Sequence, residues 1–442
     1  MRILWVKMGG LWPSTSGGRV RSLRIIGELS RRHRVTVITT HGPDEDPKGL
    51  ALHLSRCNSV KSIPYVVPKK ESATFPAAVA RSWLSPYPVD LWKWCVPAVR
   101  DEVRRLMAGN AIDLCIADFL CAVANVPLGG AVPVVLFQHN VEHLIWRRLS
   151  ELERKPWRRM LFEIEWRKLR RREAEACAGS DLTIAVSEQD RHRLASLAPG
   201  ARVLPIPTGV DTSYFVPDDT AQLPARLVFT GSMDWHPNED AVLYFIDAIL
   251  PRIRSEVPQA SFAVVGRNPS ERLRAAGGRS GVLITGTVDD VRPFVREAAV
   301  YVVPLRAGGG TRLKIFEALS LGKAVVSTTV GAEGLALASG RDAVIADGPA
   351  DFARAVVSLL RDPRRRQALG NAGRRLVESR YTWTHVASEF ETLCIDAFVR
   401  HAQTRTRASR RVDLSQDRPC TIERARALDG VRNEPGRLHR HS

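Results

Sequence analysis

The chain has no run of about twenty apolar residues, so the sequence predicts no helix that crosses a bilayer. Its seven cysteines are odd in number and scattered, and none forms the close pair that is typical of a metal site. Reduced cytosolic thiols are the simplest account, and we expect no metal. The opening residues, MRILWVKMGG, hold too short an apolar run for a secretion signal and instead predict a first strand.

A dinucleotide-binding fingerprint is also missing. The loop after the first strand, GGLWPSTSGG, lacks the spacing G-x-G-x-x-G. Gly17 and Gly18 nevertheless open a predicted helix, where bare amides can bind a phosphate or a sugar oxygen. A tight turn with close helix packing explains these two glycines equally well.

Negative charge is in short supply. The chain holds 65 Lys and Arg against 47 Asp and Glu, which gives a formal net charge of +18. Part of the excess lies from His401 onward, with ten Arg and five acids, and part lies in 144–178, with eleven cations and six acids. Such charge can attract nucleic acid or anionic lipid. No motif that reads nucleic acid accompanies it, so no nucleic-acid partner is expected.

What the chain does contain is a repeated order of strand, helix and strand. Its 442 residues exceed one ordinary core, and its apolar content of 44% is that of a globular protein. This order predicts an α/β fold with two Rossmann-like parallel-sheet domains that face each other across a cleft. The expected parts are a first domain over 1–211, a linker over 212–225, a second domain over 226–383, a returning helix over 384–402 and a disordered basic tail over 403–442.

The most informative stretch is PLRAGGGTRLKIFEALSLGKAVVSTTVGAEG at 304–334. The strand predicted over 300–306 is apolar nearly throughout, as expected of a parallel strand that is buried on both faces. Three glycines follow it, and their amides can approach a ligand without obstruction by Cβ: Gly308, Gly309 and Gly310. Thr311 is the predicted N-cap of a helix over 311–321.

Two cations and one carboxylate follow these glycines. Arg312 and Lys314 add full positive charge to a helix start that already favours anions. Thr311, Lys314 and Glu317 are spaced by three and therefore share one face of the helix. A carboxylate one turn beyond a phosphate site is well placed to accept hydrogen bonds from a ribose diol. The stretch therefore predicts capture of a nucleoside diphosphate, and an exposed Lys314–Glu317 helix pair is the structural alternative.

Further strand ends supply candidate contacts. His139 ends a strand predicted over 132–139, where its ring can donate to a carbonyl or a sugar hydroxyl, although a lone histidine is more often structural. Gly231 ends the strand predicted over 226–231, so its backbone can approach a diphosphate. Val288 follows a later strand and can lie against the face of a base.

Together these segments resemble the family-4 retaining glycosyltransferases with the GT-B fold. The second half carries the resemblance from RLVFTG to VVSTTVGAEG, and the first half carries it in AVSEQD at 185–190 and TGVDTSYF at 208–215. The resemblance implies transfer of a sugar from a nucleotide-diphosphate donor with retention at the anomeric carbon, without a metal or another cofactor. It assigns 1–211 to the acceptor and 226–383 to the nucleotide-sugar donor.

The resemblance also implies roles for single residues. Glu317 resembles the glutamate that binds the donor's ribose, and His139 resembles the cleft histidine near the donor sugar. Gly17 and Gly18 resemble the first-domain loop near the diphosphate.

Two positions depart from the family pattern. Gly309 stands where the family often has a glutamate, so no carboxylate role on the donor sugar is assigned there. The segment GSMDWHPN lacks the Arg and Lys that many members carry after the first strand of the second domain. We expect Arg312 and Lys314 to take their place from the other side of the diphosphate.

The stretch GGGTRLKIFEA resembles a subgroup that often acts in bacterial exopolysaccharide assembly. It implies a glycan or polyprenyl-linked acceptor and a cytoplasmic enzyme, peripheral on the inner face of the membrane. The segment 144–178 is the candidate for docking on an anionic membrane surface. It carries several aromatic residues among its cations: Trp146, Trp157, Phe162 and Trp166.

Two other functions remain open at this point. A sugar-nucleotide epimerase on the same scaffold needs the same diphosphate and ribose contacts, and it also needs further carboxylates for proton abstraction. A basic nucleic-acid-binding protein needs its charge to form one contiguous face.

Overall fold

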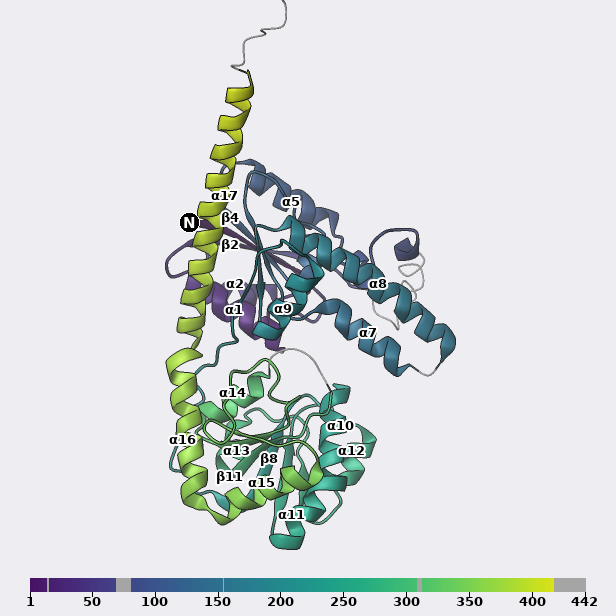
Figure 1. Ribbon diagram of the computed structural model, residues 1–442, viewed down its shortest axis with the longest axis vertical. Helices are drawn as coiled ribbons and strands as arrows, with labels where there is room; N and C mark the ends of the chain where they lie inside the picture. The colour runs from purple at the N-terminus through teal and green to yellow at the C-terminus, as the bar shows by residue number, and fades with distance from the viewer. Residues whose placement is uncertain (14–15, 69–80, 154, 308–311, 417–442) are drawn as a thin grey trace, which may run out of the picture. The chain divides into compact units, whose positions relative to one another are not determined.

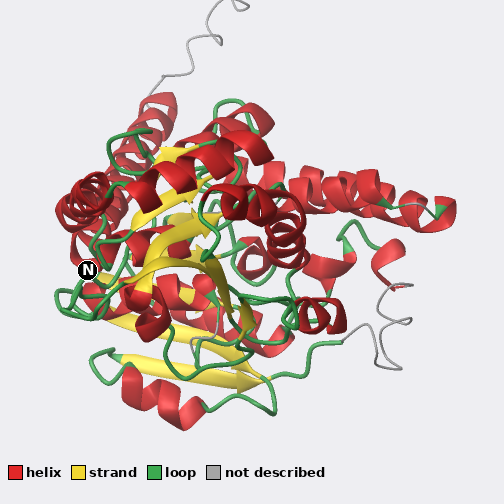
Figure 2. Ribbon diagram, turned by 90° about the horizontal axis from the view of Figure 1, so that it is seen from below, coloured by secondary structure: helices red, strands yellow, loops and turns green. Residues whose placement is uncertain are grey.

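The structure is a computed structural model that describes residues 1–13, 16–68, 81–153, 155–307 and 312–416. Its contacts group Met1–Ala397, which contains both sheets, into one compact unit, and a second unit begins at Phe398. In Figure 2 the strands lie between helices, as in layered α/β folds. None of the helices in the described part of the chain is both long and apolar enough to cross a membrane.

The first sheet has seven strands, all parallel, in the order β3-β2-β1-β4-β5-β6-β7. Its strands are β1 (Arg2–Lys7), β2 (Arg34–His41), β3 (Ser59–Pro64), β4 (Leu114–Asp118), β5 (Val134–Phe137), β6 (Leu182–Ala185) and β7 (Val203–Pro205). Its helices are α1 (Gly17–Leu29), α2 (Pro47–His53), α4 (Val89–Trp92), α5 (Pro97–Ala108), α6 (Leu120–Val123), α7 (Glu142–Leu152), α8 (Pro156–Gly179) and α9 (Glu188–Leu197).

The second sheet has six parallel strands in the order β10-β9-β8-β11-β12-β13. Its strands are β8 (Leu223–Thr230), β9 (Ser261–Val265), β10 (Val282–Ile284), β11 (Ala298–Val303), β12 (Ala324–Ser327) and β13 (Val344–Ile345). Its helices are α10 (His236–Tyr244), α11 (Leu250–Glu256), α12 (Glu271–Ala276), α13 (Arg292–Glu297), α14 (Leu313–Ser320), α15 (Pro349–Arg361) and α16 (Pro363–Arg380), and a π-helix, Phe245–Ile249, joins α10 to α11.

Two strands beside the centre of the sheets, β4 and β11, are buried along their whole length, as expected of parallel sheets covered on both faces. In each sheet the strand order reverses in direction at one point, between β1 and β4 and between β8 and β11. Ligands of such folds bind at these points, outside the carboxyl ends of the strands.

Some elements differ from the sequence-based expectation. The helical region expected over 142–178 is two helices, because Pro156 starts α8 as a new helix at a position where proline is favoured. The strand β3, with the sequence SVKSIP, was not predicted from the sequence, because it has little apolar content. A strand at the edge of its sheet, as β3 is, does not need an unbroken apolar run. Ser187 caps α9 as predicted, and its Oγ accepts from the N–H of Asp190 at 3.1 Å.

The last helix, α17 (Trp383–Gln416), corrects the expectation of disorder from residue 403, because the helix continues to Gln416. Arginine and alanine are good helix formers, and the first proline after this helix is Pro419. Before Ala397 this helix contacts residues of the first domain. Glu391 accepts from His33 Nε2 at 2.7 Å and pairs with Arg32 at 2.5 Å.

Candidate functional site

A cavity of about 620 Å³ lies at the carboxyl ends of central strands of both sheets. The first sheet contributes the start of α1 and the residues that follow β4 and β5. The second sheet contributes the residues that follow β8, β9 and β10, together with the first turn of α14. This is the place and size expected of a small-molecule site in a two-domain α/β protein.

Most residues that the sequence singled out line this cavity. They are Gly17, Gly18, His139, Gly231, Val288, Arg312, Lys314 and Glu317. The remaining four lie outside the described residues: Gly308, Gly309, Gly310 and Thr311. The helix that follows them is described from Leu313, with Arg312 at the N-cap.

Lys314 reaches across to α10 instead of pairing with its helix neighbour. Its Nζ donates to Asn238 Oδ1 at 2.9 Å and lies 4.0 Å from the centroid of the Phe229 ring. Burial, followed by the charge of Arg312, lowers the pKa of Lys314 to about 7, and burial raises the pKa of Glu317 to about 7. The structure therefore does not support the alternative of an exposed helix pair, and both side chains line the cavity.

Arg312 is 5% exposed, and its guanidinium carbon lies 5.4 Å from the centroid of the Trp235 ring. Burial lowers the pKa of Arg312, which places a desolvated cation at the start of α14. A helix start already carries free N–H groups and partial positive charge, so this end of the cavity is suited to an anion.

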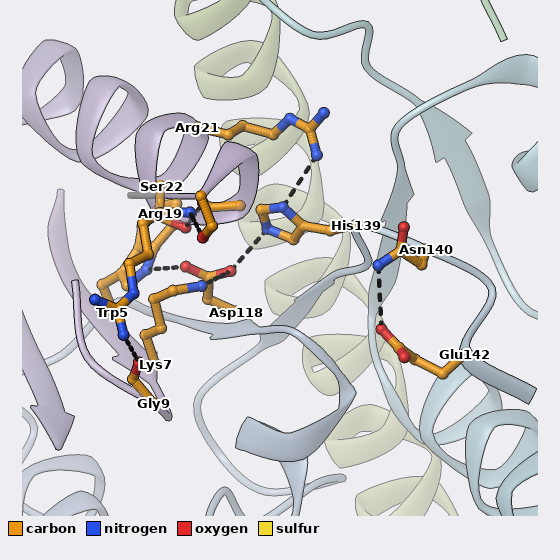
Figure 3. Close-up of polar contacts among 12 residues, drawn as sticks. Trp5, Lys7, Gly9, Arg19, Arg21, Ser22, Asp118, His139, Asn140 and Glu142 are labelled. Atoms are coloured by element: carbon orange, nitrogen blue, oxygen red, sulfur yellow. Dashed lines mark hydrogen bonds and ion pairs between the residues drawn. The ribbon is translucent and has the colours of Figure 1, made fainter. Parts of the chain in front are cut away.

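His139 is held from both sides by protein groups (Figure 3). Asp118 Oδ1 lies 2.8 Å from Nε2, and Arg21 Nη1 lies 3.0 Å from Nδ1. A carboxylate only accepts and a guanidinium only donates, so Nε2 carries the proton and Nδ1 is the acceptor. The ring also stacks on Phe119, with centroids 3.8 Å apart.

This geometry corrects the role expected of the His139 ring. The ring cannot donate to a carbonyl or a sugar hydroxyl in this arrangement, because its N–H is already engaged by Asp118. Burial lowers the pKa of His139 to about 3, so the ring is neutral near pH 7. Its observed contact toward the cavity is with Arg21, which it holds in place.

Arg21 is a buried lining residue that the sequence analysis did not single out. It is 5% exposed, its Nε donates to Thr208 Oγ1 at 3.4 Å, and burial lowers its pKa to about 10. The available signal was a cation one turn into the helix that Gly17 and Gly18 open. Such a cation faces the same ligand as the helix start.

The two glycines at the start of α1 serve close packing, which was the alternative reading of that loop. A Cβ on Gly18 would lie 2.7 Å from Cζ of Phe119, and a Cβ on Gly17 would lie 2.9 Å from Cδ1 of Leu313. Gly231 has a similar reason to lack a side chain, since its Cβ would lie 2.7 Å from Nζ of Lys314. All three glycines also line the cavity.

The charges around the cavity are strongly unequal. Four of its described lining residues are cationic: Arg21, Arg267, Arg312 and Lys314. Among the same described residues Glu317 is the one acid. Such a site can bind a diphosphate, and it can stabilise negative charge that grows on a leaving phosphate.

Two family models match the chain. One, described as Glycosyltransferase Family 4, matches residues 15–214, and the other, described as Glycosyl transferases group 1, matches residues 224–362. A GDP-mannose-dependent alpha-(1-6)-phosphatidylinositol monomannoside mannosyltransferase of Mycobacterium tuberculosis is 29% identical over 237 residues. That match covers 48% of this chain and 60% of the relative. A phosphatidyl-myo-inositol mannosyltransferase of Mycolicibacterium smegmatis is 32% identical over 218 residues, or 47% of this chain and 55% of the relative. The chain thus spans little more than half the length of these relatives.

Solved structures share the fold over nearly all of the chain. Sucrose-phosphate synthase from Thermosynechococcus elongatus has a TM-score of 0.66 at 16% identity, and the match covers 90% of this chain and 99% of that one. The protein HepE of Anabaena, solved with UDP-glucose, has a TM-score of 0.61 at 14% identity, with 89% and 99% covered. One family model matches within each half of the chain, and each half forms a parallel-sheet domain. This protein therefore belongs to the family-4 glycosyltransferases and has the GT-B fold.

Proposed function

We propose that the protein is a retaining glycosyltransferase that moves a hexose from a nucleotide-diphosphate sugar to a glycan or lipid-linked acceptor. The observation that carries the proposal is the cavity at the strand ends, where buried Arg21 and Arg312 and partly buried Lys314 meet Glu317, the one acid among its described lining residues. These cations match the two phosphates of the donor. Glu317 lies on α14 one turn beyond Lys314, where its carboxylate can accept hydrogen bonds from the ribose diol.

The mechanism follows from where charge develops. Cleavage of the bond between sugar and phosphate leaves a diphosphate of growing negative charge and a sugar with oxocarbenium character. Arg312, Lys314 and the start of α14 would stabilise the leaving group, which is electrostatic catalysis. Arg21 would act on the same group from the side of α1, since His139 and Thr208 hold its guanidinium at the cavity.

Retention requires that the acceptor attack the face from which the phosphate departs. The leaving phosphate oxygen then accepts the proton of the acceptor hydroxyl on that same face, so no protein base is needed. This suits a cavity whose described lining holds one acid, and it favours a transferase over the epimerase alternative, which needs further carboxylates. The four cations also give the diphosphate its counter-charge, so we propose no metal or other cofactor.

The physiological setting belongs to the same proposal. Two relatives are named mannosyltransferases that act on phosphatidylinositol or its monomannoside, and HepE was solved with UDP-glucose. We place the protein at the cytoplasmic face of the membrane, where a lipid-linked acceptor would be extended during exopolysaccharide or cell-surface glycan assembly. No nucleic acid is proposed as a partner.

The test begins with donor binding, measured as a shift in thermal unfolding with UDP, GDP, ADP, UDP-glucose and GDP-mannose. A ligand present at one hundred times its dissociation constant should add about 2.7 kcal/mol to the free energy of unfolding. With a donor in hand, proton NMR of the product reports the anomeric configuration directly. An inverted product would refute retention, and a full panel without a shift would refute the nucleotide-sugar site.

A further inference from the structure

Helices α7 and α8 form an antiparallel pair that extends from the first sheet (Figure 1). Inside the pair, the rings of Trp146 and Phe162 pack edge to face with centroids 5.8 Å apart. Ser150 Oγ donates to Glu163 at 2.6 Å, close to the far end of the pair. These contacts define which side of each helix faces its neighbour.

Most aromatic residues of this segment therefore face inward, in contrast to the membrane-docking role expected of them. Trp146 Nε1 donates to Asp90 Oδ2 at 2.7 Å, and Trp166 lies against the guanidinium groups of Arg147 and Arg167. Trp157 is different, since it is 60% exposed. A membrane surface on this segment must be built around Trp157 and not around the other aromatic residues.

The outer side of α8 carries a continuous stripe of exposed residues. Its members recur at spacings of three and four, which places them on one side of the helix: Trp157, Met160, Ile164, Arg167 and Arg171. Met160 is 58% exposed and Ile164 is 37% exposed. The stripe is thus apolar near the free end of the helix pair and cationic closer to the sheet.

Charge around the stripe is positive. Residues 155–172 hold eight Lys and Arg against two Glu. Arg167 pairs with Glu163 at 2.7 Å and Arg171 pairs with Glu175 at 2.9 Å, both on the helix surface. Exposed pairs of this kind are weak and are screened by salt, so both guanidiniums can exchange a carboxylate for a phosphate of a lipid headgroup.

We propose that this stripe is a docking surface for an anionic lipid bilayer. Trp157, Met160 and Ile164 enter the boundary between headgroups and acyl chains, while Arg167 and Arg171 bind phosphates at the surface. A second copy of the chain is a poorer occupant, because two such stripes would bring arginines together at seam positions of a helix pair. The inference does not depend on the transfer reaction, since it concerns a surface outside the cavity.

The test uses the full chain and co-sedimentation with two kinds of vesicle, one of phosphatidylcholine alone and one that also contains phosphatidylglycerol. One variant removes apolar surface, Trp157→Gln with Met160→Gln, and a second removes charge, Arg167→Gln with Arg171→Gln. Matched controls change equally exposed residues elsewhere: Leu52→Gln for apolar surface, and Arg279→Gln with Arg354→Gln for ion-paired arginine. Circular dichroism confirms that each variant is folded.

We expect the wild-type chain to sediment with the anionic vesicles and to be released by salt. Each basic residue near an anionic surface contributes about fivefold to partitioning, so loss of two arginines should lower the partition coefficient by about twenty-fivefold. The apolar variant should fall by at least as much, and both controls should bind as the wild type does.

Three results would overturn the proposal. The first is equal binding of the wild-type chain to both vesicle types. The second is unchanged binding of the two stripe variants. That second result would assign attachment to another surface, such as the basic C-terminal residues. The third is a wild-type dimer that the apolar variant converts to a monomer without any change in lipid binding, as judged by light scattering. That result would make the stripe a contact between copies of the chain.

Discussion

His139 donates a hydrogen bond from Nε2 to Oδ1 of Asp118 over 2.8 Å, and the side chains of both residues are almost completely shielded from solvent. Burial opposes ionisation of Asp118, but the charge of Lys7 and the hydrogen bond from His139 outweigh it and hold the pKa of Asp118 below its usual range. Trp5 Nε1 donates to the other carboxylate oxygen at 2.8 Å. Asp118 therefore orients His139, which in turn holds Arg21 at the cavity.

Replacing this carboxylate should weaken the fold. Asp118→Asn removes the counter-charge of Lys7, whose Nζ lies 3.2 Å from Oδ1 and is buried. A buried charge that loses its partner costs about 3–5 kcal/mol, which urea unfolding will show as a lower midpoint. Adding Lys7→Met to Asp118→Asn should restore part of the loss, because no unpaired charge then remains. If the double variant is no more stable than Asp118→Asn, the unpaired charge of Lys7 is not the cause of the lost stability.

Stability should fall in mild acid because of His139. Its pKa is about 3 in the folded protein and about 6.5 in the unfolded chain, so the unfolded chain binds the proton more readily. The free energy of unfolding should therefore decrease as pH falls from about 6.5 towards 3. His139→Gln should flatten the dependence in that window, measured by urea titrations at several pH values. If the free energy of unfolding of His139→Gln depends on pH as strongly as that of the wild type, other titratable groups cause the dependence.

Glu317→Ala should weaken donor binding while the fold survives. The carboxylate lies on α14 beside Lys314 and lines the cavity. A hydrogen bond to a charged group is worth about 1.5–3 kcal/mol, so the dissociation constant should rise by roughly tenfold to a hundredfold. Calorimetric titration measures it, with Glu389→Ala, an exposed glutamate of α17, as the control. Equal affinities for wild type and Glu317→Ala would remove Glu317 from the site.

Alanine at Arg312 or Lys314 should lower kcat more than it weakens binding. In the proposed mechanism both side chains face a position where negative charge grows as the bond to phosphate breaks, so we expect them to act mainly in the transition state. Loss of one such contact typically lowers kcat by about a hundredfold or more. Steady-state kinetics separates the two parameters. A variant with raised KM and unchanged kcat would make that residue an anchor for the ground state.

Arg21→Met tests a buried lining residue that the sequence analysis did not single out. Removal of a buried cation from the diphosphate side should lower kcat/KM by roughly tenfold or more. Arg21→Lys keeps the charge and should recover part of it. Arg31→Met, an exposed arginine just beyond the end of α1, is the control and should behave as the wild type does. Wild-type kinetics in Arg21→Met would assign Arg21 to the support of His139 alone.

The sequence by itself determined the two parallel sheets and most of the cavity. Apolar strands such as β11 can be predicted from the sequence, because a strand that is buried on both faces needs an unbroken apolar run. Glu317, Lys314 and Arg312 were found for a related reason, since their spacing on one short helix is a local property. The same local logic placed Ser187 at the start of α9.

Tertiary structure decided what local patterns do not contain. His139 contacts Asp118 and Arg21, which lie 21 and 118 positions away from it in the chain. No periodicity of the sequence encodes contacts over such separations. Which side of α8 faces outward is decided by the packing of α7 against its other side. In that arrangement Trp146 faces inward and Trp157 is exposed. Hydrophobic spacing shows that a helix has an apolar side, but the partner that covers that side is set by the rest of the fold.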